Sequence, residues 1–174
     1  MVFAFGAAYG FDMEIARSFT VDVPVERAWS VLADEFHDVG NWACGIQVSR
    51  KLSEEGPAGI ANRQCVVDGM GTITERVTAF DQNARTFSYT VIEGAPGMMR
   101  SMGNTWWVES KGVGQTEIRF CIRAEMKPIP AFMMGWMMKR QMNKMCDQIC
   151  EDLCAYIETG AASDKKQQQL AKAA

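Results

Sequence analysis

GTITERVTAFDQNARTFSYTV, residues 71 to 91, gives the clearest structural signal in this chain. Two runs rich in β-branched and aromatic residues, 71–80 and 85–93, lie on either side of DQNA, a tetrapeptide typical of turns. Apolar and polar residues alternate along the first run, which is the period of a half-buried strand. The stretch therefore predicts an antiparallel hairpin, and the neighbouring segments can be placed relative to it.

The strand pattern continues on both sides of this hairpin. The tetrapeptides DGMG, GAPG and KGVG are further turn signals, and the segments between them suit strands rather than helices. Such short connections make the sheet antiparallel. The expected strands, about seven in all, are 14–23, 46–52, 60–67, 71–80, 85–93, 99–109 and 115–127.

Two short helices and one long helix are expected outside the sheet. PVERAWSVLAD (24–34) has apolar residues at helical spacing behind an N-terminal proline, and EFHDVGNW (35–42) follows as a second short helix. Two further prolines begin a long helix over 130–158 that ends at Gly160. These elements predict an α+β protein in which a curved antiparallel sheet grips the long C-terminal helix, with space for a ligand between them.

The length of 174 residues is typical of a single domain with one hydrophobic core. We expect that domain to cover 13–160. The apolar segment 1–12 precedes a second methionine and is interpreted as an N-terminal extension. Residues 161–174 have no apolar periodicity, so they are expected to form a flexible tail.

Composition argues against several functional classes. The formal charge of −3 and the lack of a basic stripe argue against nucleic-acid binding. No apolar run reaches the roughly 18 residues of a transmembrane helix, and no basic region precedes the apolar N-terminus as in a signal peptide. A cytoplasmic location is therefore expected, and the six cysteines, which form no CxxC pair, are interpreted as reduced thiols.

No metal or other cofactor is expected. GMGTIT does not fit a dinucleotide-binding loop, and Cys146, Cys150 and Cys154, although evenly spaced on the long helix, lack partners that would complete a tetrahedral site. We interpret these cysteines as small packing residues. The single histidine, His37, is expected near the mouth of the ligand space, where it is either a base or a residue without a chemical role.

Glu75 is the most informative polar residue in the hairpin. Alternation places it on the apolar face of 71–80, together with Ile73, Val77 and Ala79. A buried carboxylate needs a partner or stays protonated. A three-residue turn at 68–70 would set Arg63 opposite Glu75 on the neighbouring strand. The pair is interpreted either as a group that orients a ligand or moves a proton, or as a structural ion pair.

Strand parity identifies further residues that face the same space. Tyr89 and Val91 share a face with Phe87, and the Tyr89 hydroxyl is either a ligand contact or a core group bonded to the backbone. On the next strand, the residues expected on one face are Arg100, Met102, Asn104, Trp106 and Val108.

The long helix has a continuous apolar stripe that is expected to pack on the sheet. Its members are Met134, Met138, Met142, Met145, Ile149, Leu153 and Tyr156. The first two turns extend this surface with Phe132, Met133, Trp136 and Met137, here called the Met/Trp patch. Because methionine adapts to irregular surfaces, the patch is interpreted as a portal that contacts a membrane or a partner, or alternatively as core or a dimer interface.

Three segments together resemble a known family: VPVERAWSVLADEFHDVGNW, GIANR and GTITERVTAFDQNARTFSYTV. Their order and spacing are similar to those of the START-like, helix-grip superfamily, within it the polyketide cyclase/dehydrase group also called SRPBCC. The resemblance covers 14–158 and implies a cavity for lipids, sterols, quinones, polyketides or phenolics, with catalysis in only some members.

The resemblance also implies roles for individual residues. The residue aligned with Glu75 lines the pocket of the plant abscisic-acid receptors, and aromatase/cyclase relatives use a pocket tyrosine and arginine. The DGMG connection is shorter than the receptors' gate loop and their latch motif is missing around 94–99, so a hormone-receptor role is not expected.

Three functions are compatible with these observations. The first is binding of a small hydrophobic molecule such as a lipid, quinone or polyketide-like compound. The second is a polyketide cyclase, aromatase or dehydratase in which Arg63 or Tyr89 polarises a carbonyl and Glu75 moves a proton. The third is a partner-binding module that uses the Met/Trp patch. The expected ligand-binding residues are Arg63, Ile73, Glu75, Tyr89, Val91, Met102, Asn104, Trp106, Met134, Met138 and Met142.

Overall fold

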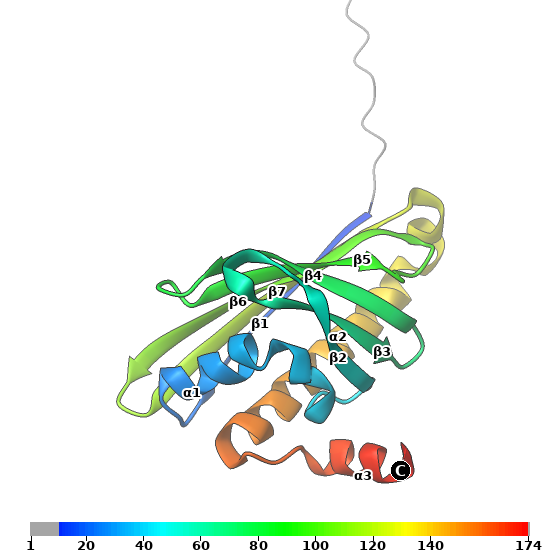
Figure 1. Ribbon diagram of the computed structural model, residues 1–174. Helices are drawn as coiled ribbons and strands as arrows, with labels where there is room; N and C mark the ends of the chain where they lie inside the picture. Colours follow the sequence, from blue (N-terminus) through cyan, green and yellow to red (C-terminus); the bar gives the residue numbers. More distant parts are fainter. Residues whose placement is uncertain (1–10, 174) are drawn as a thin grey trace, which may run out of the picture.

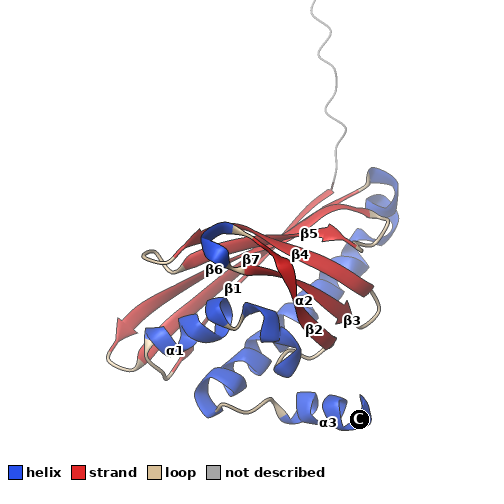
Figure 2. Cartoon of the chain, in the orientation of Figure 1, coloured by secondary structure: helices blue, strands red, loops and turns tan. Residues whose placement is uncertain are grey.

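A computed structural model of the protein describes residues 11–173, although the side chains of 11–12, 58, 128–134 and 173 lie outside the description. A seven-stranded antiparallel sheet curves around one long helix, α2, and the short helices that follow the first strand lie on the same side of the sheet as α2 (Figures 1 and 2). The predicted α+β helix-grip fold is confirmed.

The strands follow the predicted order and pair in the sequence β1-β7-β6-β5-β4-β3-β2. Their bounds are β1 (Phe11–Val21), β2 (Ile46–Glu55), β3 (Ala61–Val67), β4 (Gly71–Asp81), β5 (Thr86–Glu93), β6 (Met99–Gly112) and β7 (Gln115–Met126). β1 forms one edge of the sheet and pairs with β7, so the first and last strands of the chain lie side by side.

The helical elements include the expected short helices after the first strand. Their bounds are α1 (Val25–Trp29), the π-helical turn η1 (Ser30–Asp34), η2 (Phe36–Asn41), η3 (Pro57–Gly59), α2 (Pro128–Thr159) and α3 (Asp164–Ala173). The long helix ends at Gly160, whose φ of 74° is the left-handed conformation that glycine adopts without steric cost. No described helix is both long and apolar enough to cross a membrane.

The β3–β4 hairpin has the predicted register. Arg63 lies directly opposite Glu75, and a tight turn over 68–70 connects the two strands. Gly69 adopts a φ of 74° within that turn. The register therefore places the two charged side chains on the same face of the sheet, as parity indicated.

Two irregularities in the sheet change the predicted parity. A shift after Val77 turns Ala79 outward and lets Phe80 pack against Trp29, with ring centroids 5.5 Å apart. A second shift after Met99 buries that methionine and exposes Arg100. The expectations that Ala79 and Arg100 face the interior are therefore wrong, because each bulge adds one residue to its strand.

Both predicted chain ends differ from the structure. The backbone of Phe11 and Asp12 already pairs with β7, so part of the expected extension 1–12 belongs to β1, and residues 1–10 lie outside the description. The expected flexible tail contains helix α3, with Lys166 completely buried. Hydrogen bonds from α3 to distant parts of the chain hold it in place, and sequence periodicity does not reveal such bonds.

Candidate ligand-binding cavity

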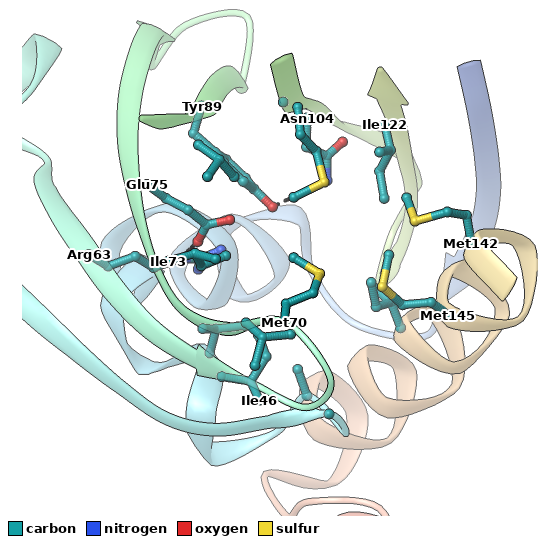
Figure 3. Close-up of a pocket in the computed structure, with 18 of the residues that line it drawn as sticks. Ile46, Arg63, Met70, Ile73, Glu75, Tyr89, Asn104, Ile122, Met142 and Met145 are labelled. Atoms are coloured by element: carbon teal, nitrogen blue, oxygen red, sulfur yellow. Dashed lines mark hydrogen bonds and ion pairs between the residues drawn. The ribbon is translucent and has the colours of Figure 1, made fainter. Parts of the chain in front are cut away.

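A cavity of about 440 Å³ lies between the concave face of the sheet, the short helices and α2 (Figure 3). Its wall is mostly apolar. Met134 belongs to the part of α2 whose side chains are outside the description. Every other residue expected to bind ligand lines the cavity: Arg63, Ile73, Glu75, Tyr89, Val91, Met102, Asn104, Trp106, Met138 and Met142.

Arg63 and Glu75 form a buried ion pair in the cavity wall. Their residues are 5% and 6% exposed, and Arg63 Nε donates a 2.5 Å hydrogen bond to Glu75 Oε2. Burial is the largest single influence and by itself would lower the pKa of Arg63, but the Glu75 carboxylate together with Tyr89 and Cys65 raises the pKa above its ordinary value. The guanidinium therefore stays charged and paired, and the wall carries no net charge at this point.

Phe36 on η2 completes the surroundings of Arg63. Its carbonyl accepts a 2.6 Å hydrogen bond from Arg63 Nη1, and its ring lies 3.9 Å from the guanidinium carbon. The ring of Tyr89 lies 5.0 Å from the same carbon. Arg63 is thus held by an ion pair, a backbone carbonyl and two aromatic faces, which fixes it as part of the wall.

Tyr89 and Asn104 form a second polar group on the neighbouring strands β5 and β6. Asn104 Nδ2 donates to the Tyr89 hydroxyl at 3.4 Å, whereas Asn104 Oδ1 is buried and has no hydrogen-bond partner among the described residues. Burial, and then the nearby Glu75 carboxylate, raise the pKa of Tyr89, so its hydroxyl keeps its proton. In Figure 3 both side chains point into the cavity.

Unpaired buried polar atoms are rare because each costs free energy of desolvation. The amide of Asn104, only 6% exposed, is therefore a ready partner for a polar atom of a bound molecule. Together with the tyrosine hydroxyl it offers one donor and one acceptor side by side, surrounded by apolar wall.

Two other carboxylates line the cavity, and neither is without a partner. Glu35 pairs with Arg27 at 3.4 Å, and Asp68 is exposed and bonded to Gln47. Among the charged lining residues, each carboxylate thus has a partner in the protein.

Several lining residues were not among the predicted ligand contacts. They come from the short helices, the loops, strands β2 and β7 and the long helix α2, and include Val39, Trp42, Ile46, Met70, Met98, Ile122, Met145 and Ile149. Strand parity does not predict which way the side chains of loop residues point. The presence of an apolar residue, Met70, in the polar DGMG turn was nevertheless a sign that this turn faces the cavity.

The remaining predicted candidates lie away from the cavity chemistry. His37 is not a lining residue, and its Nε2 lies 3.5 Å from Asp38 of the same helix. Burial raises the pKa of Cys146, Cys150 and Cys154 to about 11, so these thiols are protonated at neutral pH. The described residues contain no group of ligands that could hold a metal ion.

The Met/Trp patch is described only in part. Trp136 is 71% exposed and Met137 44% exposed, whereas the side chains of Phe132 and Met133 are outside the description. Met138, the next residue of α2, lines the cavity. The exposed apolar surface therefore adjoins the cavity wall.

The fold and this apolar cavity define a START-like, helix-grip protein. Residues 12–158 match the family described as polyketide cyclase / dehydrase and lipid transport, and the chain belongs to that family. No curated protein matches it significantly.

Solved structures with the same fold have low sequence identity to this chain. A START superfamily protein from Mycobacterium smegmatis has a TM-score of 0.68 at 14% identity, covering 83% of this chain and 96% of that one. The Zhui aromatase/cyclase from Streptomyces sp. R1128 has a TM-score of 0.66 at 16% identity, covering 88% and 100%. Norcoclaurine synthase from Thalictrum flavum has a TM-score of 0.65 at 13% identity, covering 86% and 99%. At such identities the likeness extends to the fold alone.

Proposed function

We propose that this protein binds an uncharged, hydrophobic small molecule with a polar end, such as a lipid, quinone or polyketide-like compound. The observation that carries the proposal is the apolar cavity of about 440 Å³ with an unpaired buried amide oxygen on Asn104. Apolar pockets with a few convergent polar groups are typical small-molecule sites. The family description, which includes lipid transport, supports the same role.

The charges of the wall favour a neutral ligand. Among the described residues that line the cavity, Arg63 is the only cation, and the Glu75 carboxylate already neutralises its charge. A ligand carboxylate would enter a site of low polarity without a free cation, and such burial is costly. A ligand hydroxyl, in contrast, both donates and accepts, so it suits the pair formed by Tyr89 and Asn104.

Three naphthalenes of similar size test this proposal by isothermal titration calorimetry. We expect 2-naphthol to bind more tightly than 2-methoxynaphthalene, and both to bind more tightly than 2-naphthoate at neutral pH. Equal binding of all three would contradict a site with defined polar recognition, and preference for the naphthoate would contradict the neutral wall.

A cyclase, aromatase or dehydratase is the second candidate, because the family description and the Zhui aromatase/cyclase both refer to such chemistry. In this cavity Tyr89 is the free donor, since Arg63 is held by Glu75 and a backbone carbonyl. Loss of one water from a poly-β-ketone thioester, abolished in Glu75→Gln, would favour the enzyme. A purely binding protein keeps its affinity in Glu75→Gln within about tenfold, or roughly 1.4 kcal/mol.

The exposed part of the Met/Trp patch supports a transient contact with an anionic membrane surface. Trp136 and Met137 are followed by the exposed cations Lys139 and Arg140, and tryptophan with basic residues is typical of the membrane interface. Since the patch adjoins the cavity wall, such a contact would serve ligand exchange.

The six free thiols accord with the cytoplasmic location expected from the sequence.

A further inference from the structure

Helix α3 lies beyond the residues that match the family, yet it contains a completely buried lysine. Lys166 is 0% exposed, and its Nζ donates a 2.6 Å hydrogen bond to the carbonyl of Ile46 at the start of β2. Burial lowers the pKa of this lysine, as expected for an amine removed from water. This contact ties α3 to the start of β2.

A buried carboxylate on α2 joins α3 to the cavity wall. Asp152 accepts hydrogen bonds from the Ser163 hydroxyl at 2.6 Å and from the backbone N–H of Cys44 at 2.7 Å. The Ser163 oxygen also accepts the backbone N–H of Lys166 at 3.3 Å, which caps the first turn of α3. Cys44 lines the cavity, so the start of α3 and the wall share the same buried acceptor.

Gln169 bridges two cavity-lining loops directly. Its Oε1 accepts the backbone N–H of Gly45 at 3.3 Å, and its Nε2 donates to Asp68 Oδ2 at 3.2 Å. The two loops also meet through a 2.7 Å hydrogen bond from Asp68 N to the Gly45 carbonyl. One side chain of α3 thus reinforces a junction between segments that are separate in the sequence.

This junction lies where the cavity reaches the surface. Asp68 and Gly69 are exposed and nevertheless line the cavity, as does Gly45. Figure 1 shows α3, in red, beside β2 and the C-terminal part of α2. The loops over 44–46 and 68–70 therefore form an edge of the cavity mouth, and α3 holds them together from outside.

We propose that α3 is a clamp on the cavity mouth, in which Lys166 and Gln169 are positioning residues that control how fast a bound molecule leaves. The inference rests on the proposed function, because it concerns retention of a ligand in that cavity. Release through this edge requires the two loops to separate. Each hydrogen bond from α3 raises the cost of that separation, so loss of these bonds speeds release.

The test is the dissociation rate of N-phenyl-1-naphthylamine, a neutral fluorescent probe, from the full chain by stopped-flow displacement. Lys166→Met and Gln169→Ala are expected to raise the rate about three- to tenfold, the effect of losing one or two ordinary hydrogen bonds. The matched controls are Lys172→Met and Gln168→Ala, because both residues are exposed on the same helix. Thermal unfolding of each variant is measured in parallel, and rates are compared well below the unfolding midpoints.

The outcomes separate the clamp from the cavity. Faster release in Gln169→Ala with an unchanged unfolding midpoint supports the clamp even if Lys166→Met fails to fold. Wild-type rates in both variants, or equal acceleration in the two controls, would overturn the clamp alone. A wild-type chain that binds no probe at all would instead overturn the proposed function, and the clamp with it.

Discussion

Replacing Arg63 by methionine tests the ion pair that forms the polar wall of the cavity. Methionine keeps the length of the side chain but leaves the Glu75 carboxylate, 6% exposed, without its partner. Removing one member of a buried pair typically costs about 3–5 kcal/mol, because an uncompensated charge stays buried. For a chain of this size, each 1 kcal/mol shifts the unfolding midpoint by roughly 2–4 °C, so a loss of about 6–20 °C is expected.

The exposed ion pair formed by Arg76 on β4 and Glu54 on β2 is a matched control. Its hydrogen bond is 3.0 Å long, but the two side chains are 44% and 62% exposed. Exposed pairs contribute about 0–1 kcal/mol, so Arg76→Met should change the free energy of unfolding only slightly. Combining Arg63→Met with Glu75→Leu removes both buried charges and should recover most of the loss.

Urea unfolding followed by tryptophan fluorescence measures all four proteins. The expected order of stability, from most to least stable, is wild type, Arg76→Met, the double variant and finally Arg63→Met. If Arg63→Met were as stable as Arg76→Met, the carboxylate of Glu75 would not depend on its partner. The pair would then be free for acid–base chemistry, and the argument for a neutral, structural wall would fail.

Asn104→Leu should weaken 2-naphthol binding about two- to tenfold in calorimetry without lowering the unfolding midpoint of the free protein, whereas equal loss for 2-methoxynaphthalene would refute the amide's role. Met138→Trp should fill the cavity and weaken 2-naphthol at least tenfold by the same assay, and unchanged affinity would place the ligand elsewhere. Trp136→Glu should abolish co-sedimentation with phosphatidylglycerol vesicles at unchanged stability, whereas capture of a protein without vesicle binding would indicate a partner surface instead. Burial in the folded protein raises the pKa of Cys146 and Cys150 from 9.0 to about 11, so their contribution to stability is present below pH 9 and is lost as pH rises through about 11. Replacing both cysteines by alanine should therefore flatten the decline of the unfolding midpoint over this pH range. An unaltered pH profile of the unfolding midpoint would contradict this prediction.

The sequence predicted the fold and much of the cavity because both follow from local patterns. Turn length and the two-residue period of strands fix the register of a hairpin, so the sequence alone was enough to pair Arg63 with Glu75. The same parity placed Tyr89 and Asn104 on the inner wall. Helical spacing likewise identified Met142 as part of the buried face of α2.

Features that depend on distant partners could not be predicted in this way. The bulges that turn Ala79 and Arg100 outward depend on pairing with neighbouring strands. The buried Lys166 depends on a carbonyl of Ile46, 120 positions away in the chain, and a polar sequence such as DKKQQQ gives no sign of it. Loop residues such as Met70 line the cavity because of tertiary packing rather than periodicity.

Native mass spectrometry of the full chain, incubated with 2-naphthol, tests whether the cavity binds a small hydrophobic molecule. One bound molecule is expected per 19.4 kDa chain, released on denaturation and absent from the Met138→Trp variant. A freshly purified sample should also show whether a cellular molecule occupies the same place, since organic extraction would release it for identification. A chain that remains bare in repeated preparations and gains no 2-naphthol, or a Met138→Trp variant that binds it as well as the wild type, would contradict a ligand-binding cavity.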